Sequence, residues 1–291
     1  MRSLYTGFSA AFSGGFAGVA PSYARVATTV PSTTRSNEYG WLGQLPRVRE
    51  WIGDRVINNL TAHGYTLRNK PFELTVGVKR DDIEDDNVGI YAPLFTELGR
   101  AAASFPDELV WPTLAAGFTT ACYDGQYFFD TDHPVIGADG VTVSSVSNTS
   151  GGSGTAWYLL DTSRAIKPLI FQSRKPLSNL VRLDRETDEA MFMEGKALYG
   201  VDGRCNAGYG LWQLAHASKQ TLDATNYEAA RVAMTGMKGD HGRPLGIKPN
   251  LLVVGPTQEG AARDLLSLKT LPNGGENKWF GSAELEVCPW L

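Results

Sequence analysis

The first 36 residues constrain the fold most, because they offer little material for a hydrophobic core. Twenty-one of them are Gly, Ala, Ser or Thr, and the charged side chains among them are Arg2, Arg25 and Arg35. Such a stretch buries too little apolar surface to offset the entropy that is lost on ordering. We therefore predict a mobile arm that becomes ordered against something outside itself, for which a neighbouring subunit is the simplest candidate.

The segment that follows the arm has the alternating pattern of a strand. Phe72, Leu74, Val76 and Val78 alternate with polar or small residues, which predicts a strand with one apolar face. The earlier stretch 48–57 is rich in β-prone residues, and turn residues lie between the two. We predict a long two-stranded hairpin over residues 46–80. A lone hairpin is marginal in water, so it should also lean on another surface.

The charge along this segment is lopsided. Residues 46–80 carry seven basic residues against three acidic ones, and residues 81–86 then place five acidic residues in six positions. One explanation is a solvated helix start, because Asp and Glu favour helix N-termini. The other is that basic and acidic parts meet across a subunit boundary, where exposed pairs would set register more than affinity. The candidate interface residues are Arg47, Arg49, Arg55, Arg68, Lys70, Asp81, Asp82, Asp85 and Asp86.

The remainder of the chain mixes helical and strand-like patterns. Apolar residues recur at three- and four-residue steps over 87–116, which predicts a long helix, and Pro106 predicts that it is kinked or in two parts. Residues 147–155 are predicted to form a flexible loop. Strands are expected at 157–160, 166–172, 191–201, 209–215, 251–254 and 283–287, and further helices at 225–237, opened by a Thr225–Glu228 capping box, and at 257–268. Strands and helices do not alternate regularly, so the predicted fold class is α+β.

Composition and charge exclude several classes of protein. The formal net charge is −4, so the chain lacks the excess of basic residues that is typical of a dedicated nucleic-acid binder. No apolar run approaches the ~18 residues that a membrane span needs. The three cysteines, Cys122, Cys205 and Cys288, are far apart, which predicts buried thiols and neither a disulfide framework nor a zinc site.

One cluster of residues carries possible chemistry. Asp124, Asp130, Asp132 and His133 lie within ten positions. Carboxylates and an imidazole can hold a divalent metal that activates water, so a metal-dependent hydrolase using Asp130, Asp132 and His133 stays open as an alternative. However, the Asp-Gly and His-Pro pairs here are ordinary turn dipeptides. We favour a hydrogen-bonded turn, with no metal, no cofactor and no catalytic residue.

Several motifs, in a fixed order, give the chain a resemblance to the major head subunit of Mu-like bacteriophages. The first is the acidic run 81–86 followed by Tyr-Ala-Pro-Leu-Phe at 91–95. The others are Phe-Phe-Asp-Thr-Asp-His-Pro at 128–134, Gly-Tyr-Gly-Leu-Trp-Gln at 208–213, Pro-Asn-Leu-Leu-Val-Val at 249–254, and the closing segment 283–291. The resemblance covers about residue 36 to residue 291.

The resemblance implies the Hong Kong 97-type capsid fold. This fold has an N-terminal arm, a hairpin called the extension loop, a peripheral domain with a long spine helix, and an axial domain. The implied ranges are 1–45 for the arm, 46–81 for the extension loop, 82–120 and 155–218 for the peripheral domain, and 121–154 and 219–291 for the axial domain. The order of the segments also implies that Leu291 ends near residue 155.

The function that the resemblance implies is that of a major capsid protein. Such a protein is assembled in the host cytoplasm into the virion head, where hexamers and pentamers form an icosahedral shell around double-stranded DNA. The expected partners are further copies of the chain, portal, scaffold or protease and decoration proteins, and DNA bound without sequence specificity; no membrane is expected. An encapsulin-like nanocompartment shell, which encloses an enzyme cargo, stays open as an alternative.

Overall fold

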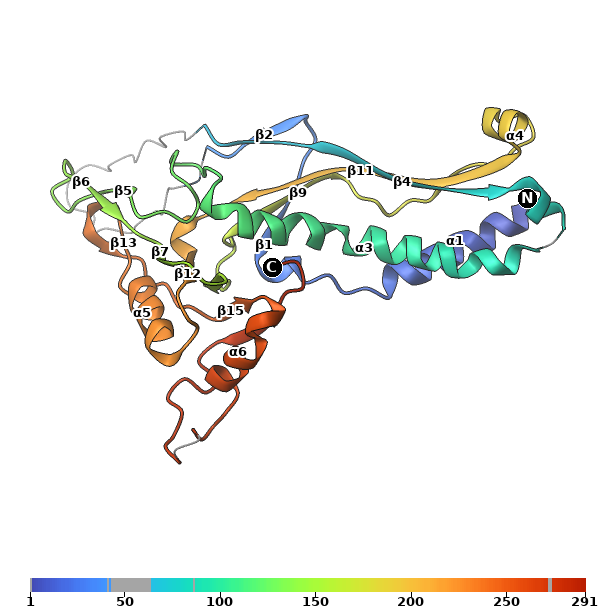
Figure 1. Ribbon diagram of the computed structural model, residues 1–291. Coiled ribbons are helices and arrows are strands. Elements are labelled where there is room, and N and C mark those ends of the chain that lie inside the picture. Colours follow the sequence, from blue (N-terminus) through green and yellow to red (C-terminus); the bar gives the residue numbers. More distant parts are fainter. Residues whose placement is uncertain (1, 41, 43–63, 86, 272–273) are drawn as a thin grey trace.

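The computed structural model describes residues 2–40, 42, 64–85, 87–271 and 274–291 (Figure 1). It confirms the predicted α+β class. The α-helices are α1 (Arg2–Ala17), α2 (Arg80–Glu84), α3 (Ala92–Ala115), α4 (Glu189–Glu194), α5 (Ala224–Thr235) and α6 (Glu259–Leu266). The strands are β1 (Ala27–Pro31), β2 (Ser36–Glu38), β3 (Thr66–Arg68), β4 (Lys70–Lys79), β5 (His133–Ile136), β6 (Val143–Val146), β7 (Thr149–Gly152), β8 (Trp157–Leu160), β9 (Leu169–Lys175), β10 (Val181–Leu183), β11 (Lys196–Tyr209), β12 (Ala215–Lys219), β13 (Lys238–Gly239), β14 (Arg243–Pro244), β15 (Leu251–Val254) and β16 (Glu284–Val287).

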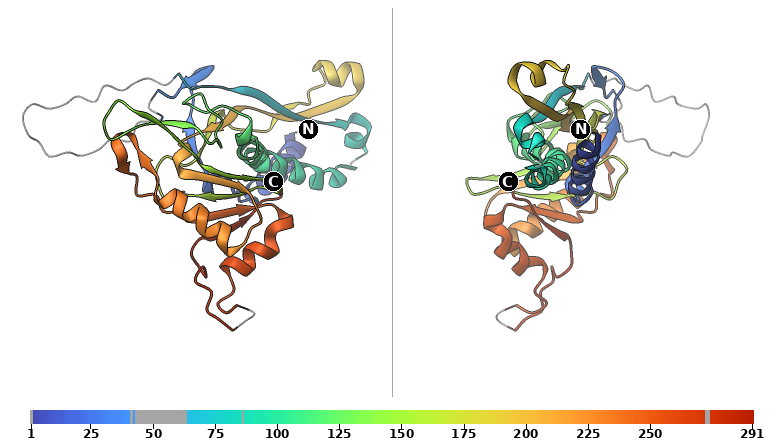
Figure 2. Two further views of the ribbon diagram at one scale, coloured as in Figure 1. Left: turned by 60° about the vertical axis from the view of Figure 1, so that its left-hand side comes forward. Right: turned by 90° about the vertical axis from the view of Figure 1, so that its right-hand side faces the viewer.

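A long five-stranded sheet forms one half of the molecule. Its order is β1-β9-β11-β10, and β4 pairs antiparallel with β11 along its whole length. The helices α1 and α3 lie side by side along one face of this sheet, whereas α4 projects from the opposite face at the far end (Figures 1 and 2). The predicted strand over 72–78 is therefore confirmed as β4. Its described partner is β11, while the strand predicted at 48–57 lies outside the described residues.

The second sheet has the order β16-β15-β8-β12-β7, and the helices α5 and α6 pack beside it. Because β16 is parallel to β15 and β15 is antiparallel to β8, the C-terminal strand lies one strand away from Trp157–Leu160. Leu291 also packs against Gly255, and Gln258 Nε2 donates a hydrogen bond to the Thr155 carbonyl oxygen at 3.0 Å. The end of the chain therefore approaches the region around residue 155, as the resemblance implied.

The arm is ordered by its own chain, which corrects the prediction that it awaits a neighbouring subunit. Phe8 and Phe12 of α1 are buried, and the Phe8 ring stacks on Phe95 of α3 with centroids 4.2 Å apart. The same ring meets Tyr199 of β11 edge-on at 5.4 Å. After α1, strand β1 pairs in parallel with β9. The sparse apolar residues of the arm thus suffice, because they complete a core that α3 and the sheet begin.

The long helix is not divided into two parts at Pro106, which is one of the two expected forms. Its 24 residues form one continuous element, although Pro106 and Pro112 lie inside it. A proline in a helix interior costs about 3 kcal/mol through the lost hydrogen bond and a steric clash. Burial along one face, including Phe95, Val110 and Trp111, outweighs this cost.

Four local predictions are corrected in the second half of the chain. Residues 191–194 belong to helix α4, and strand β11 begins after Gly195, whose left-handed backbone ends the helix. Residues 209–215 do not form the predicted strand. Strand β11 ends at Tyr209, and Trp212–Leu214 form a short 3₁₀ helix. Part of the predicted loop at 147–155 is β7, parallel to β12. The N-cap of α5 is Asp223 and not a Thr225 capping box: its carboxylate accepts from the backbone N–H of Asn226.

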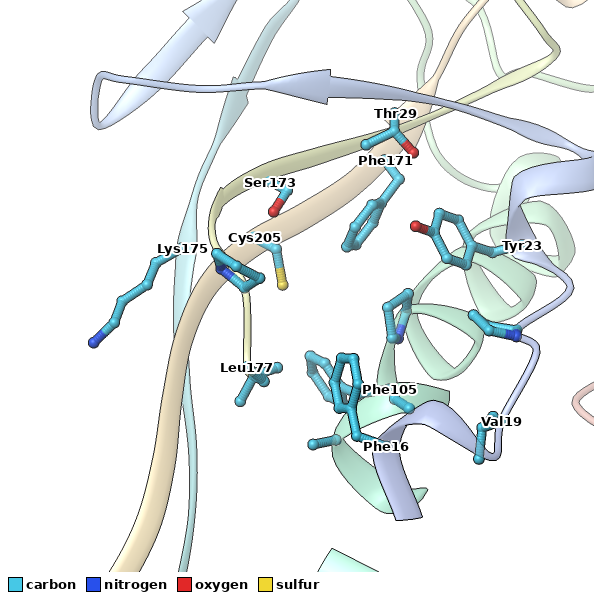
Figure 3. A pocket seen from close by; sticks show the side chains of 15 residues that line it. Phe16, Val19, Tyr23, Thr29, Phe105, Phe171, Ser173, Lys175, Leu177 and Cys205 are labelled. Atoms are coloured by element: carbon cyan, nitrogen blue, oxygen red, sulfur yellow. The ribbon is translucent and has the colours of Figure 1, made fainter. Parts of the chain in front are cut away.

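The buried apolar residues form two clusters, and a cavity of about 300 Å³ lies where they meet (Figure 3). Ala102 and Leu177 line it from the smaller cluster under α1, and Phe171 and Cys205 line it from the larger one. Close to the cavity, Pro106 interrupts the hydrogen bonding of α3. The pairing of β11 with β9 also shifts register between Arg204 and Cys205. The junction between the two halves is therefore less regular than either half.

Candidate assembly interface

The candidate interface residues that the structure describes fall at the two ends of β4. Arg68 and Lys70 are exposed where β3 leads into β4, and Asp81 and Asp82 lie in α2 just beyond the other end. Asp85 is exposed and follows α2. Arg47, Arg49, Arg55 and Asp86 lie outside the described residues.

The structure does not bring these basic and acidic residues together within one chain. Strand β4 has ten residues, and a strand rises about 3.3 Å per residue, so about 33 Å separates the two groups. Asp82 instead accepts a hydrogen bond from the Tyr91 hydroxyl, and this bond raises the pKa of Tyr91. The predicted pairing is therefore left with one arrangement, in which the basic end of one copy faces the acidic end of another.

Large exposed apolar side chains gather at three extremities of the molecule, which sequence reasoning missed. One group is on β10 and α4, a second on the β5–β6 hairpin, and a third near the loop after α6. The most exposed members are Val181, Leu183, Phe192 and Met193 in the first group, Val141 and Val143 in the second, and Leu268, Leu271 and Phe280 in the third. The missed signal is the pair Phe192-Met193, which follows Met191: a strand would alternate, whereas a short helix buries Met191 and exposes its neighbours.

Charged groups tie the arm to helix α3 and to the second sheet. The buried carboxylate of Asp107 in α3 accepts the backbone N–H groups of Ser22 at 3.0 Å and Tyr23 at 2.6 Å. Arg25 then forms ion pairs with Glu284 and Glu286 of β16. The segment between α1 and β1 therefore links the spine-like helix α3 to the C-terminal sheet.

The predicted metal cluster is rearranged in the structure. Among the described residues, one group of potential ligands brings its atoms within 4.8 Å of one another: Cys122, Asp124 and His133. Asp124 Oδ2 lies 2.7 Å from His133 Nδ1, and Asp124 Oδ1 lies 3.1 Å from Cys122 Sγ. His133 is fully buried, and its ring stacks on Trp212 with centroids 3.9 Å apart.

Two hydrogen bonds join the members of this trio. Burial alone raises the pKa of Asp124, but the hydrogen bonds from His133 and Cys122 outweigh it and lower the pKa below its usual value. Burial and the neighbouring Asp124 charge raise the pKa of the Cys122 thiol, so the thiol is protonated and can donate to Asp124. The geometry is that of a carboxylate that accepts from two donors.

Asp130 and Asp132 do not join that trio. Asp130 accepts hydrogen bonds from the backbone N–H groups of Thr131 at 2.7 Å and Tyr127 at 3.2 Å, which is the hydrogen-bonded turn that the sequence predicts. The hydrogen bond between Asp130 and Asp132 raises the pKa of the exposed Asp132. The proposed hydrolase set of Asp130, Asp132 and His133 is therefore not assembled around one point.

The other polar groups buried in the second sheet have structural surroundings. His216 Nε2 and the Ser150 hydroxyl share a hydrogen bond of 2.7 Å, and His216 Nδ1 has no partner among the described residues. Burial lowers the pKa of His216 to about 4, so the ring is neutral near pH 7. A serine–histidine pair needs an acid at Nδ1 to orient the base, and this atom lacks one here. The three cysteines are buried free thiols, as predicted.

Comparison with known proteins shows to which family the chain belongs. The family described as Mu-like prophage major head subunit gpT matches residues 1–291. The chain belongs to this family of major head subunits. It is 49% identical to the Mu-like prophage FluMu major head subunit of Haemophilus influenzae over 272 residues, which cover 91% of this chain and 88% of the relative. It is 44% identical to the major capsid protein of Escherichia phage Mu, with 100% of this chain and 98% of the relative covered.

A solved capsid structure is similar as well. The chain in the procapsid of bacteriophage JBD30 is 49% identical and superposes with a TM-score of 0.88, covering 100% of this chain and 98% of that one. The likeness confirms the predicted capsid architecture and is consistent with the Hong Kong 97-type fold. The protein is thus a major capsid protein of the Mu-like family, a structural subunit of the virion head. Among the described helices, none combines the length and apolar character that a membrane span needs.

Proposed function

We propose that copies of this chain assemble into the hexamers and pentamers of an icosahedral shell that encloses double-stranded DNA. The observation that carries the proposal is the match of the whole chain to the major head subunit family. The molecule itself supports it: exposed apolar groups sit at the extremities, and basic and acidic groups sit at opposite ends of β4. A contact between unlike surfaces closes into rings when the rotation between copies closes.

The division into domains forms part of this proposal. Residues 1–45 serve as the arm, 46–81 as the extension loop, 82–120 and 155–218 as the peripheral domain, and 121–154 and 219–291 as the axial domain. The second sheet contains strands from both the peripheral and the axial ranges, since β8 and β12 lie beside β7 and β15. The two domains would therefore share a continuous sheet, which suits a subunit that transmits force across a shell.

DNA is enclosed without tight or sequence-specific binding in this proposal. Attraction to phosphates grows with positive charge, whereas the formal net charge here is −4. The portal, scaffold or protease and decoration proteins stay predicted partners. The absence of an enzymatic role is also proposed, on the ground that the family is a structural one.

Electron microscopy of the purified protein tests the proposal. We expect particles or rings with fivefold and sixfold symmetry and a native mass far above the 31.5 kDa of one chain. A protein that stays monomeric at every concentration and ionic strength, also when produced together with the other head proteins, contradicts the proposal. Particles that enclose an enzyme cargo instead of DNA would favour the nanocompartment alternative.

Charge reversal tests the pairing of the two ends of β4. We expect Asp81→Lys with Asp85→Lys to impair assembly, because both side chains are exposed and would then face Arg68 and Lys70 of the neighbour. Adding Arg68→Glu and Lys70→Glu should restore part of the assembly. The urea midpoint of the unassembled subunit serves as the control and should not change. Normal assembly of the Lys variant would remove the pairing hypothesis.

A further inference from the structure

The far end of the long sheet carries an apolar surface that the described part of the chain leaves open. We call it the distal tip and define it as β10, α4 and the residues between them, 181–194. Val181 and Leu183 of β10 are 55% and 51% exposed, and Phe192 and Met193 of α4 are 81% and 72% exposed. Four large apolar side chains at this exposure on one extremity are unusual for a monomer and mark an interaction site.

Strand register shows which face the β10 side chains occupy. Ala197, Tyr199 and Val201 of β11 are buried in the cluster beneath α1 and α3. Val181 lies opposite Gly200 and Leu183 opposite Leu198, so both point to the other face of the sheet. None of the described elements covers that face, from which α4 projects (Figure 1). The exposed side chains of β10 and the helix α4 therefore lie on the side of the sheet opposite to α1 and α3.

The distal tip is set in acidic surroundings. The backbone N–H of Arg80 donates to the Gly195 carbonyl oxygen at 2.8 Å, which fixes the start of α2 against the end of α4. Residues 80–85 and 181–196 together hold nine acidic residues against four basic ones. A partner surface for this tip should therefore be cationic, with side chains that also cover apolar groups.

Such a surface exists at the opposite end of the same sheet. Five exposed cations, which we call the basic cluster, lie where the β2–β3 pair joins β9, β11 and β4. They are Arg35, Arg68, Lys70, Arg174 and Arg204. The Asn69 backbone N–H donates to the Arg35 carbonyl oxygen, and Arg204 lies opposite Pro71, so the members come from neighbouring backbone segments. Lys70 lies opposite the buried Cys205 and points to the side of the helices, so the cluster spans both sides of β4, the edge strand at this end of the sheet among the described strands. Arg204 lies on the same face as Val181, because it is an even number of residues from Gly200 on β11.

Geometry prevents one molecule from joining these two surfaces. Lys196 and Cys205 mark the two ends of the β4–β11 pairing, nine residues or about 30 Å apart. Among the described residues, this basic cluster can therefore meet the tip only when it belongs to another copy. Arg guanidinium groups stack on aromatic rings, and the methylene stems of Arg and Lys cover apolar side chains. Both properties suit Phe192 and Met193 within an acidic rim.

We propose that the distal tip of one copy docks on the basic cluster of a second copy, head to tail. The proposal rests on the proposed function, because it names the surfaces through which the subunits associate. The apolar side chains supply the contact area, and the charges fix orientation and exclude a tip-to-tip contact between two acidic surfaces.

Photo-crosslinking locates the partner surface directly. The photoreactive residue p-benzoylphenylalanine, placed at position 192 in the full chain, should link to peptides of another copy that contain residues 35, 68–70, 174 or 204. The same residue placed at Val232, which is 64% exposed on α5, is the matched control and should not link to them. Links from position 192 to any other surface of the neighbour, or an absence of links in assembled particles, overturn the proposal.

Substitution provides an independent readout. Phe192→Ser with Met193→Ser should raise the protein concentration needed for assembly at least about tenfold and leave the urea midpoint of the subunit unchanged, since both side chains are mostly exposed. Val232→Ser should leave assembly unchanged. If the wild-type chain assembles and the double variant assembles equally well, this inference fails and the proposed function stands. If the wild-type chain never assembles, the proposed function itself fails.

Discussion

At the scale of single residues, two glycines decide how the arm is held. A Cβ on Gly15 of α1 would lie 2.0 Å from the Thr96 carbonyl oxygen of α3. A Cβ on Gly99 of α3 would lie 2.1 Å from the Phe12 carbonyl oxygen of α1. The two helices therefore approach each other backbone to backbone, with one glycine from each side. The glycines that make the first 36 residues look unstructured in the sequence thus permit the contact that orders them.

Gly15→Ala should destabilise the subunit by about 1–3 kcal/mol, because the methyl group overpacks a backbone contact that cannot yield. Gly14→Ala is the matched control: it is exposed, with nothing within 4 Å of its Cβ, and should stabilise the helix by about 0.5–1 kcal/mol. Urea unfolding of the unassembled subunit, followed by circular dichroism, measures both. Equal effects of the two substitutions would contradict the close approach of α1 and α3.

His216 should make the subunit sensitive to acid. Its folded pKa of about 4 lies below the ordinary value of 6.5, so the unfolded chain binds more protons between these values. The contribution of the neutral His216 to the free energy of unfolding is complete above pH 6.5. It falls as the pH approaches 4 and is smaller by about 2–3 kcal/mol at pH 4.5. His216→Gln should lose less unfolding free energy between pH 7 and pH 4.5 than the wild type. His241→Asn, at an exposed site with φ of 63°, should match the wild type.

At the scale of elements, the sequence predicts what local pattern controls and misses what tertiary contact controls. The runs that became β4, β8 and β15 are read correctly, because alternation or an unbroken apolar run is a property of the strand itself. The helical state of α1 is missed because it depends on α3. The switch from α4 to β11 is missed because Gly195 ends the helix within one apolar run. The candidate interface residues are predicted from charge alone, whereas the apolar tip required knowing which side chains stay exposed.

The cavity between the two clusters offers a test at this scale (Figure 3). Ala103 of α3 is buried and lines the cavity, so Ala103→Leu adds three carbons where space of about 300 Å³ exists. At about 0.8 kcal/mol for each buried methylene, it should stabilise the subunit by about 1–2 kcal/mol after the loss of side-chain freedom. Ala101→Leu on the exposed side of α3 is the control and should change stability by less than about 0.5 kcal/mol. Destabilisation by Ala103→Leu would mean that the cavity closes in solution.

At the scale of the whole molecule, the arm has a different role from the one that its composition predicts. A mobile arm that packed only on a neighbouring subunit could be deleted without loss of subunit stability. Here, however, α1 buries Phe8 and Phe12, and Arg25 links the following segment to β16. Removing the arm would therefore expose the smaller core before it affected contacts between copies. Assembly defects of arm deletions consequently report on folding, and interface tests should instead use surface residues.

Ionic strength separates the two sources of association energy in the intact protein. The Debye length falls from about 10 Å at 0.1 M salt to about 3 Å at 1 M, so the attraction between the acidic tip and the basic cluster is screened. Burial of apolar groups is not weakened in this way. We expect the concentration needed for assembly to rise between 0.1 M and 0.5 M sodium chloride, as measured by light scattering at constant pH. The Asp81→Lys, Asp85→Lys variant should assemble more weakly at 0.1 M and respond less to added salt. An equal response of both proteins would show that charge pairing at this end of β4 does not contribute to assembly.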